Sequence, residues 1–174
     1  MKILAFAGSN SKKSINKQLV EYVSKNHLNE HEVKVIDLND FEVPLYSIDR
    51  EKANGIPAKI QEFVNMIEGF DALVVSLAEH NGAYTVAFKN LIDWSSRHEL
   101  KFFAGKPMIL MATSPGGYGG KNVLAIAEDR LSKFDASIEA VFSLPKFNDN
   151  FHKDKGIVDK EKREELEKAL LKIF

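Results

Sequence analysis

Three loops rich in glycine, serine and asparagine carry the residues of this chain best suited to bind a phosphate or a flat ring. They are residues Gly8–Asn16, Ala78–Gly82 and Thr113–Gly120, and each follows a strongly apolar run of strand length. One such loop is usually an ordinary turn. Three of them, each after a buried strand, are expected to meet at one edge of an open α/β sheet, where such folds bind ligands.

The first loop suits a phosphate monoester. Gly8 permits a sharp turn, and the free N–H groups and positive end of the following predicted helix attract an anion. Side-chain donors and positive charge come from Ser9, Ser11, Ser14, Asn16, Lys12 and Lys13. The alternative interpretation is that Ser14 only caps the helix.

Two other nucleotide-binding patterns fail. The letters G-x-x-x-x-K-S from Gly8 to Ser14 lack the second glycine of the triphosphate-binding loop. No G-x-G-x-x-G follows the first predicted strand. Asp37 has the position of a ribose ligand, but we predict that it caps a helix or turn.

The second and third loops can offer backbone groups to a heterocycle. Their glycines leave room for close approach. The residues are Glu79, His80, Asn81, Gly82, Ser114, Pro115, Gly116, Gly117, Gly119 and Gly120. Glu79 and His80 could also form an acid/base pair or two metal ligands. A third ligand at sensible spacing is missing, and His98 and His152 stand alone, so we predict no metal site.

The elements that carry these loops alternate between strands and helices, as in a parallel sheet covered on both faces. The runs Ile3–Ala7, Ala72–Leu77 and Met108–Ala112 are nearly continuous, which predicts central strands. Polar residues interrupt Val33–Asp37 and Ser137–Val141, which predicts outer strands. This favours the strand order 2-1-3-4-5 over the dinucleotide-binding order 3-2-1-4-5. The fold class predicted is α/β: a flavodoxin-like three-layer αβα sandwich with a five-stranded parallel sheet.

Apolar spacing predicts the helices. One stripe is formed by Ile56, Ile60, Phe63, Val64 and Ile67, and a second by Leu166, Leu170 and Ile173. The segment Thr85–Trp94 is apolar on several faces and needs a second partner. Burial within the chain and a subunit interface both remain open. We predict a homo-oligomer through this helix, because we expect a monomer to expose Phe88, Leu91 or Trp94.

Length and composition limit the class of protein. The chain has 174 residues, which predicts one domain, residues 1–174. Lys and Arg number 24, Asp and Glu 25, and the net charge of −1 indicates neither a nucleic-acid nor a membrane-surface protein. The absence of cysteine excludes a disulfide framework, a thiolate nucleophile and a Cys-based zinc site. We see neither a signal peptide nor a membrane span, and expect a cytoplasmic protein.

Four segments together resemble the NADPH-dependent FMN reductase family. GSNSKKSINKQL is similar to the family's G-S-x-R-x-x-S-x-N-x-x-L opening, and AEHNGAYTVAFKNLIDW resembles its P-E-Y-N-G-S…L-K-N-x-I-D-W signature. SPGGYGG resembles its third loop, and DLNDFEVPLY the segment after its second strand. The match covers nearly the whole chain in the right order.

The resemblance implies an FMN protein, usually dimeric or tetrameric, that oxidises NADPH or NADH and reduces flavins, quinones, azo dyes or similar acceptors. Hydride would pass from nicotinamide C4 to flavin N5, and electrons then to a second substrate in the same pocket. The cofactor carries this chemistry, so no catalytic acid or base is nominated. By motif position, Ser9, Ser14, the Ile15 N–H and Asn16 would hold the phosphate, while Glu79, His80, Asn81, Ser114, Pro115, Gly116 and Gly117 would line the isoalloxazine.

The chain departs from the family pattern at three positions. Ser11 stands in place of arginine, Ala78 in place of proline and His80 in place of tyrosine. Two alternatives follow. A flavodoxin-type electron carrier would bind FMN without oxidising NAD(P)H, but the net charge of −1 argues against protein docking of that kind. Ser11 and Ala78 leave open a second alternative, a non-catalytic oligomer that keeps the fold but has lost tight flavin binding.

Overall fold

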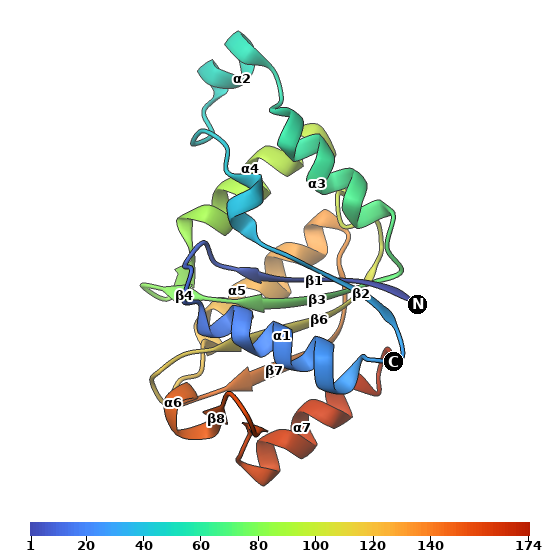
Figure 1. Ribbon diagram of the computed structural model, residues 1–174. Helices are drawn as coiled ribbons and strands as arrows, with labels where there is room; N and C mark the ends of the chain where they lie inside the picture. The colour runs from blue at the N-terminus through green and yellow to red at the C-terminus, as the bar shows by residue number, and fades with distance from the viewer.

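A five-stranded parallel sheet forms the centre of the computed structural model, which describes residues 1–174. The order is β2-β1-β3-β6-β7, which confirms the predicted order 2-1-3-4-5 (Figure 1). β1, β3 and β6 are buried almost throughout, whereas β2 and β7 have exposed positions, as their polar residues predict. The strands are β1 (Lys2–Gly8), β2 (Glu32–Ile36), β3 (Ala72–Leu77), β6 (Pro107–Thr113) and β7 (Ser137–Leu144).

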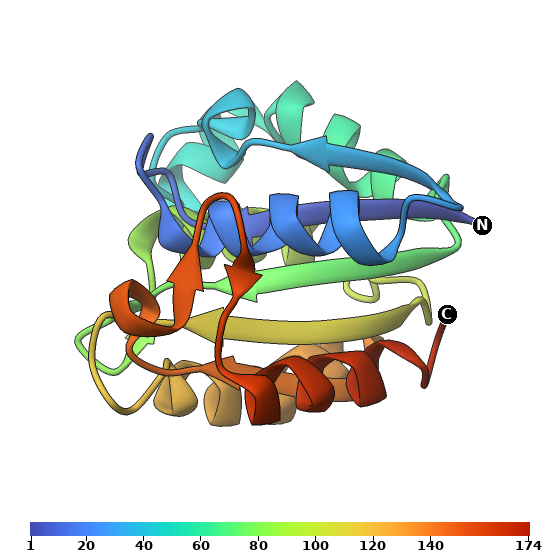
Figure 2. The same ribbon diagram turned by 60° about the horizontal axis from the view of Figure 1, so that its bottom comes forward.

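Helices cover both faces of the sheet (Figure 2). Alternate residues of β1 enter opposite cores: Ile3 and Ala5 join the core under α1 and α7, and Leu4 and Phe6 join the core under α3, α4 and α5. This alternation follows from the two-residue period of a strand. The helices are α1 (Ile15–His27), α3 (Ala58–Glu68), α4 (Val86–His98), α5 (Lys121–Leu131) and α7 (Lys160–Leu170).

Shorter elements connect this frame. α2 buries no residue and projects from the body of the molecule (Figure 1). These elements are η1 (Leu38–Phe41), α2 (Ile48–Asn54), β4 (Glu79–His80), β5 (Ala83–Tyr84), η2 (Ser132–Phe134), α6 (Phe147–Asn150), β8 (Phe151–His152) and β9 (Gly156–Ile157). None of the helices is long and apolar enough to span a membrane.

Two predicted helices are shorter than their apolar stripes. α3 begins at Ala58, after Pro57, so Ile56 lies outside it. A residue before proline is driven out of helical backbone angles, which explains this boundary. At the C-terminus α7 ends at Leu170, and Ile173 lies in the turn that follows.

The expectation that a monomer exposes Phe88, Leu91 or Trp94 is wrong. All three are at most 3% exposed within the single chain. The second partner of α4 is the segment Val43–Tyr46 of the same chain, because the Trp94 Nε1–H donates to the Pro44 carbonyl at 2.7 Å and the Tyr46 ring packs edge-on against Trp94. Phe88, Leu91 and Trp94 of α4 therefore give no evidence of a subunit interface.

Candidate functional site

The side chain of Asn16 ties the start of α1 to the ends of β3 and β6. Its Oδ1 accepts from the Ser76 hydroxyl at 2.7 Å and from the Thr113 N–H at 2.9 Å, and its Nδ2 donates to the Thr113 carbonyl at 3.1 Å. Asn16 is 2% exposed. The first and third loops are thereby held next to each other, as predicted. The side chain is committed to the strands, so a bound phosphate would meet the backbone N–H of Asn16.

A second side chain fixes the other side of the first loop. The Thr85 hydroxyl donates to the Gly8 carbonyl at 2.9 Å and accepts from the Phe88 N–H at 3.1 Å, which also caps α4. Gly8 is needed there, because a Cβ would lie 2.7 Å from Leu77 Cδ2 and 3.2 Å from the Phe88 ring. Thus the sharp turn at Gly8 packs directly against α4.

The first loop presents unused hydrogen bond donors. Ser14 caps α1 by accepting from the Lys17 N–H at 3.2 Å. Its hydroxyl proton remains available, as does that of Ser9, whose oxygen accepts from the Ser11 N–H. The N–H groups of Ile15 and Asn16 donate to no protein acceptor. Ser11 is exposed, and its oxygen accepts from the Lys13 N–H at 3.3 Å.

An ion pair anchors the end of β2 beside this loop. Lys17 Nζ lies 2.5 Å from Asp37 Oδ2. The hydrogen bond to Lys17 lowers the pKa of Asp37 despite partial burial, and the same bond raises the pKa of Lys17. Asp37 also accepts from the Asn39 N–H and caps η1, so the prediction of a cap is confirmed.

The second loop is a two-residue hairpin between β4 and β5. Asn81 and Gly82 have φ angles of 52° and 76°, as a type I′ turn requires. The Asn-Gly pair is a strong hairpin signal that the sequence interpretation did not use. His80 is exposed on the hairpin, whereas the Glu79 carboxylate accepts from the Val123 N–H at 3.0 Å and from Asn122 Nδ2 at 3.1 Å. Glu79 therefore caps α5 and fixes the hairpin to it.

Tyr84 closes the hairpin from the inside. Its hydroxyl is buried without a hydrogen bond partner, and burial raises the pKa of Tyr84 to about 12. The ring packs edge-on against Phe88, with 5.4 Å between centroids. Tyr84 remains protonated near neutral pH and serves as packing between the hairpin and α4.

The third loop contains two pairs of glycines in different environments. Gly116 and Gly117 are exposed, have no heavy atom within 4 Å of an added Cβ, and their N–H groups have no protein acceptor. Gly119 and Gly120 are buried with φ angles of 62° and 77°. Only the first pair leaves room for a ligand; the second pair permits the turn into α5. Ser114 and Pro115 precede the open pair, and the Lys146 N–H fixes the Gly116 carbonyl at 2.9 Å.

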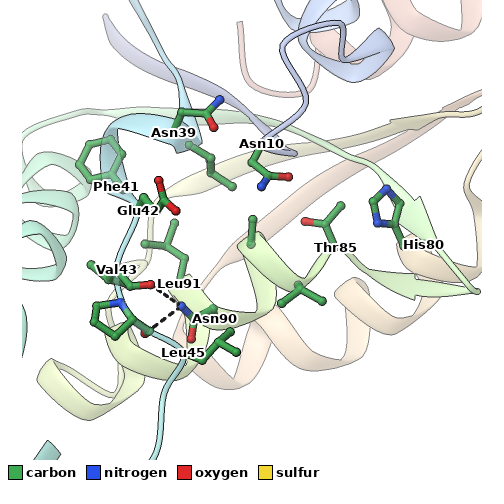
Figure 3. A pocket seen from close by; sticks show the side chains of 14 residues that line it. Asn10, Asn39, Phe41, Glu42, Val43, Leu45, His80, Thr85, Asn90 and Leu91 are labelled. Atoms are coloured by element: carbon green, nitrogen blue, oxygen red, sulfur yellow. Dashed lines mark hydrogen bonds between the residues drawn. The ribbon is translucent and has the colours of Figure 1, made fainter. Parts of the chain in front are cut away.

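A cleft of about 510 Å³ lies beside these loops, between the first loop, the segment 38–45 and the start of α4 (Figure 3). Of the predicted site residues only His80 lines it. Asn90 holds the outer wall, since its Nδ2 donates to the Val43 and Pro44 carbonyls and its Oδ1 accepts from the Tyr46 N–H at 2.8 Å. The sequence signal for this wall was the segment DLNDFEVPLY.

The arrangement fits a flavin mononucleotide. Unused N–H groups at the start of α1 and two hydroxyl protons suit one phosphate, since a helix N-terminus attracts anions. Across the sheet edge, Gly116 and Gly117 offer N–H groups and open space for a ring. No group of three or more His, Asp and Glu side chains is arranged to hold a metal ion.

Comparison with known proteins gives one family and a consistent fold. The NADPH-dependent FMN reductase family matches residues 1–168. An NAD(P)H-dependent FMN reductase of Pseudomonas aeruginosa is 36% identical over 85 residues, 48% of this chain and 45% of that protein. A quinone reductase of Escherichia coli (strain K12) is 34% identical over 79 residues, 45% of this chain and 42% of that protein. These matches span less than half of each relative.

Among solved structures, a flavoenzyme NAD(P)H:(acceptor) oxidoreductase from Paracoccus denitrificans has the same fold. Its TM-score is 0.75 at 24% identity, over 96% of this chain and 91% of that one. An azoreductase from Bacillus anthracis superposes with a TM-score of 0.67 at 16% identity, over 97% of this chain and 96% of that one. At these identities the likeness shows the flavodoxin-like fold.

Proposed function

Because the chain belongs to the NADPH-dependent FMN reductase family, we propose that it binds FMN and oxidises NADPH or NADH. The electrons then pass to a small acceptor of the flavin, quinone or azo class, which is also the class named for its relatives. One observation carries the proposal: the donors of the first loop and the open glycines of the third loop face the same sheet edge, joined through Asn16.

The first loop would hold the phosphate. Four donors converge there: the hydroxyls of Ser9 and Ser14 and the N–H groups of Ile15 and Asn16. The positive end of α1 strengthens them. Lys12 and Lys13 are exposed in the same loop and would supply the positive charge that Ser11 does not.

The second and third loops would hold the ring. When bound, FMN supplies hydride acceptance from the nicotinamide. The protein would position it with fixed groups: Glu79 fixes the hairpin to α5, and the free N–H groups of Gly116 and Gly117 would stabilise negative charge on a reduced ring. Ser114, Pro115, His80, Asn81 and Gly82 complete the lining in this proposal.

Steady-state oxidation of NADPH and NADH by the FMN-loaded protein tests the function, with a quinone as acceptor and the FMN-free protein as control. We expect oxidation that depends on FMN and a cofactor that is released as FMN. Flavin binding without oxidation of either coenzyme would instead indicate an electron carrier. Protein that neither copurifies with FMN nor responds to its titration would contradict the proposal.

Substitutions in the first loop test the phosphate site. Hydrogen bonds to a charged group contribute about 1.5 to 3 kcal/mol, so Ser14→Ala should weaken FMN binding about tenfold to a hundredfold. Ser11→Arg should tighten it, because arginine adds a charged, forked donor. Fluorescence titration measures both. Ser47→Ala, which removes the equivalent cap of α2, is the matched control. If all three variants bound FMN with equal affinity, the first loop would serve only to cap the helix.

The domain organisation, cellular location and oligomeric state are also part of the proposal. We propose that residues 1–174 act as one flavin-binding domain, in the cytoplasm, and as a homodimer or homotetramer. The exposed side chains of Leu45, Ile48 and Val86 now support assembly in place of the buried residues of α4. Light scattering on the protein at micromolar concentration tests it, and a monomer mass would contradict it.

A further inference from the structure

A second groove, of about 1020 Å³, runs along α1 on the face that also carries α7. One wall is α1, and the other is the hairpin formed by β8 and β9, which lies beside α1 (Figure 2). Its residues are mostly polar and charged. Apart from Lys12 and Lys13, none of them belongs to the proposed flavin site.

The groove is positively charged. Its lining includes Lys12, Lys13, Lys25, Lys153 and Lys155 against two carboxylates, Glu21 and Asp154, which gives a net charge of +3 in a chain whose net charge is −1. None of these five lysines forms an ion pair, whereas Lys17, Lys89, Lys160 and Lys162 do. A concave surface with charge of one sign concentrates ligands of the opposite sign.

Aromatic packing holds the floor in place. The Tyr22 ring meets Phe151 edge-on, with 5.5 Å between centroids, and the Tyr22 hydroxyl lies 3.2 Å from His27 Nε2. Gly156 has a φ of 69° and lies against the Tyr22 ring, where a Cβ would not fit. Burial lowers the pKa of His27, so near neutral pH the positive charge of the groove comes from the lysines.

The groove starts at the candidate phosphate site. Lys12 and Lys13 line it and also belong to the first loop, between Ser9 and Ser14. An extended ligand in the groove would therefore end next to the flavin site. The proposed reaction supplies one such ligand, the reduced nicotinamide coenzyme, which carries a pyrophosphate and, in NADPH alone, a 2′-phosphate on the adenosine ribose.

We propose that this lysine-lined groove binds the phosphorylated adenosine half of the coenzyme and thereby selects NADPH over NADH. The inference rests on the proposed function. It assigns the selection to the lysines of the β8–β9 hairpin, Lys153 and Lys155, together with Lys12, Lys13 and Lys25. A phosphomonoester would form charge-assisted hydrogen bonds with several unpaired ammonium groups there, whereas a ribose hydroxyl carries no charge and would bind them more weakly.

Calorimetry with adenosine 2′,5′-bisphosphate and adenosine 5′-monophosphate tests the groove without relying on activity. The FMN-loaded protein should bind the bisphosphate about tenfold more tightly, since each charge-assisted bond contributes about that factor. Lys153→Gln/Lys155→Gln should remove about that tenfold preference and lower the ratio of KM for NADH to KM for NADPH in parallel. Both lysines are exposed, so the fold should tolerate the change. Lys168→Gln/Lys172→Gln, an equal change of charge outside the groove, is the control and should alter neither quantity.

The two proposals fail in different ways. Equal binding of the two nucleotides, or a preference that the hairpin substitutions leave intact, would overturn the groove assignment while NAD(P)H oxidation stands. A groove-dependent preference for the bisphosphate in a protein that oxidises neither coenzyme would overturn the proposed function and the assignment of the ligand as NADPH. The assignment would be supported if the preference for the bisphosphate and the ratio of KM for NADH to KM for NADPH both fell in Lys153→Gln/Lys155→Gln and neither changed in the control variant.

Discussion

Replacing Asn16 with alanine is expected to lower the free energy of unfolding by about 3 kcal/mol and to abolish tight FMN binding. The substitution removes three hydrogen bonds and leaves the Ser76 hydroxyl and the Thr113 N–H and carbonyl buried without partners. Each buried unsatisfied group costs about 1 to 3 kcal/mol. Because the same side chain joins the first loop to the third, the phosphate and ring sites should separate. Urea denaturation and FMN titration measure the two effects.

Asn10→Ala is the matched control for this prediction. Asn10 is an exposed amide in the same loop with no hydrogen bond in the protein. Its removal should change stability by less than about 0.5 kcal/mol. If Asn16→Ala were as stable as Asn10→Ala, the connection between α1 and the strands would contribute nothing, and the account of how the loops are positioned would be wrong.

Two glycines of the third loop are expected to respond in opposite ways. Gly116→Val should leave stability nearly unchanged, since nothing lies within 4 Å of its added Cβ, yet weaken FMN about a hundredfold by filling the space of the ring. Gly119→Ala should destabilise the fold by about 2 kcal/mol, because its φ is 62° and the Cβ would meet Pro145 N at 2.8 Å.

Each variant is the other's control, with thermal unfolding and FMN titration as the two measurements. A Gly116→Val protein that binds FMN like the unmodified one would show that the ring does not lie against this loop. A Gly119→Ala protein of unchanged stability would show that the turn into α5 has more freedom than its packing indicates.

The sheet could be predicted from the sequence because a strand buried on both faces appears there as a continuous apolar run. Strands such as Ala72–Leu77 must be apolar at every position, whereas the outer strand Glu32–Ile36 keeps polar residues. Strand order follows from that contrast. The ends of the strands then placed the three loops on one edge.

The partner of α4 was not predictable in the same way. Val43–Tyr46 has no regular secondary structure and therefore no periodic pattern. Asn90 and Trp94 hold it through backbone carbonyls, which every residue possesses, so the sequence does not identify the partner. The role of Glu79 is hidden for a related reason: it caps a helix 44 positions later in the chain. Such contacts depend on tertiary structure.

The attachment of Val43–Tyr46 to α4 has a consequence for tracing ancestry through short motifs. Asn90 and Trp94 belong to the second signature motif, yet both act on the scaffold, by holding the wall of a cleft. A descendant that lost its cofactor would still need them to fold, whereas the open glycines Gly116 and Gly117 would be free to drift. A relative that keeps this motif has therefore inherited the fold. A relative that also keeps the two glycines is the better candidate for having inherited flavin binding.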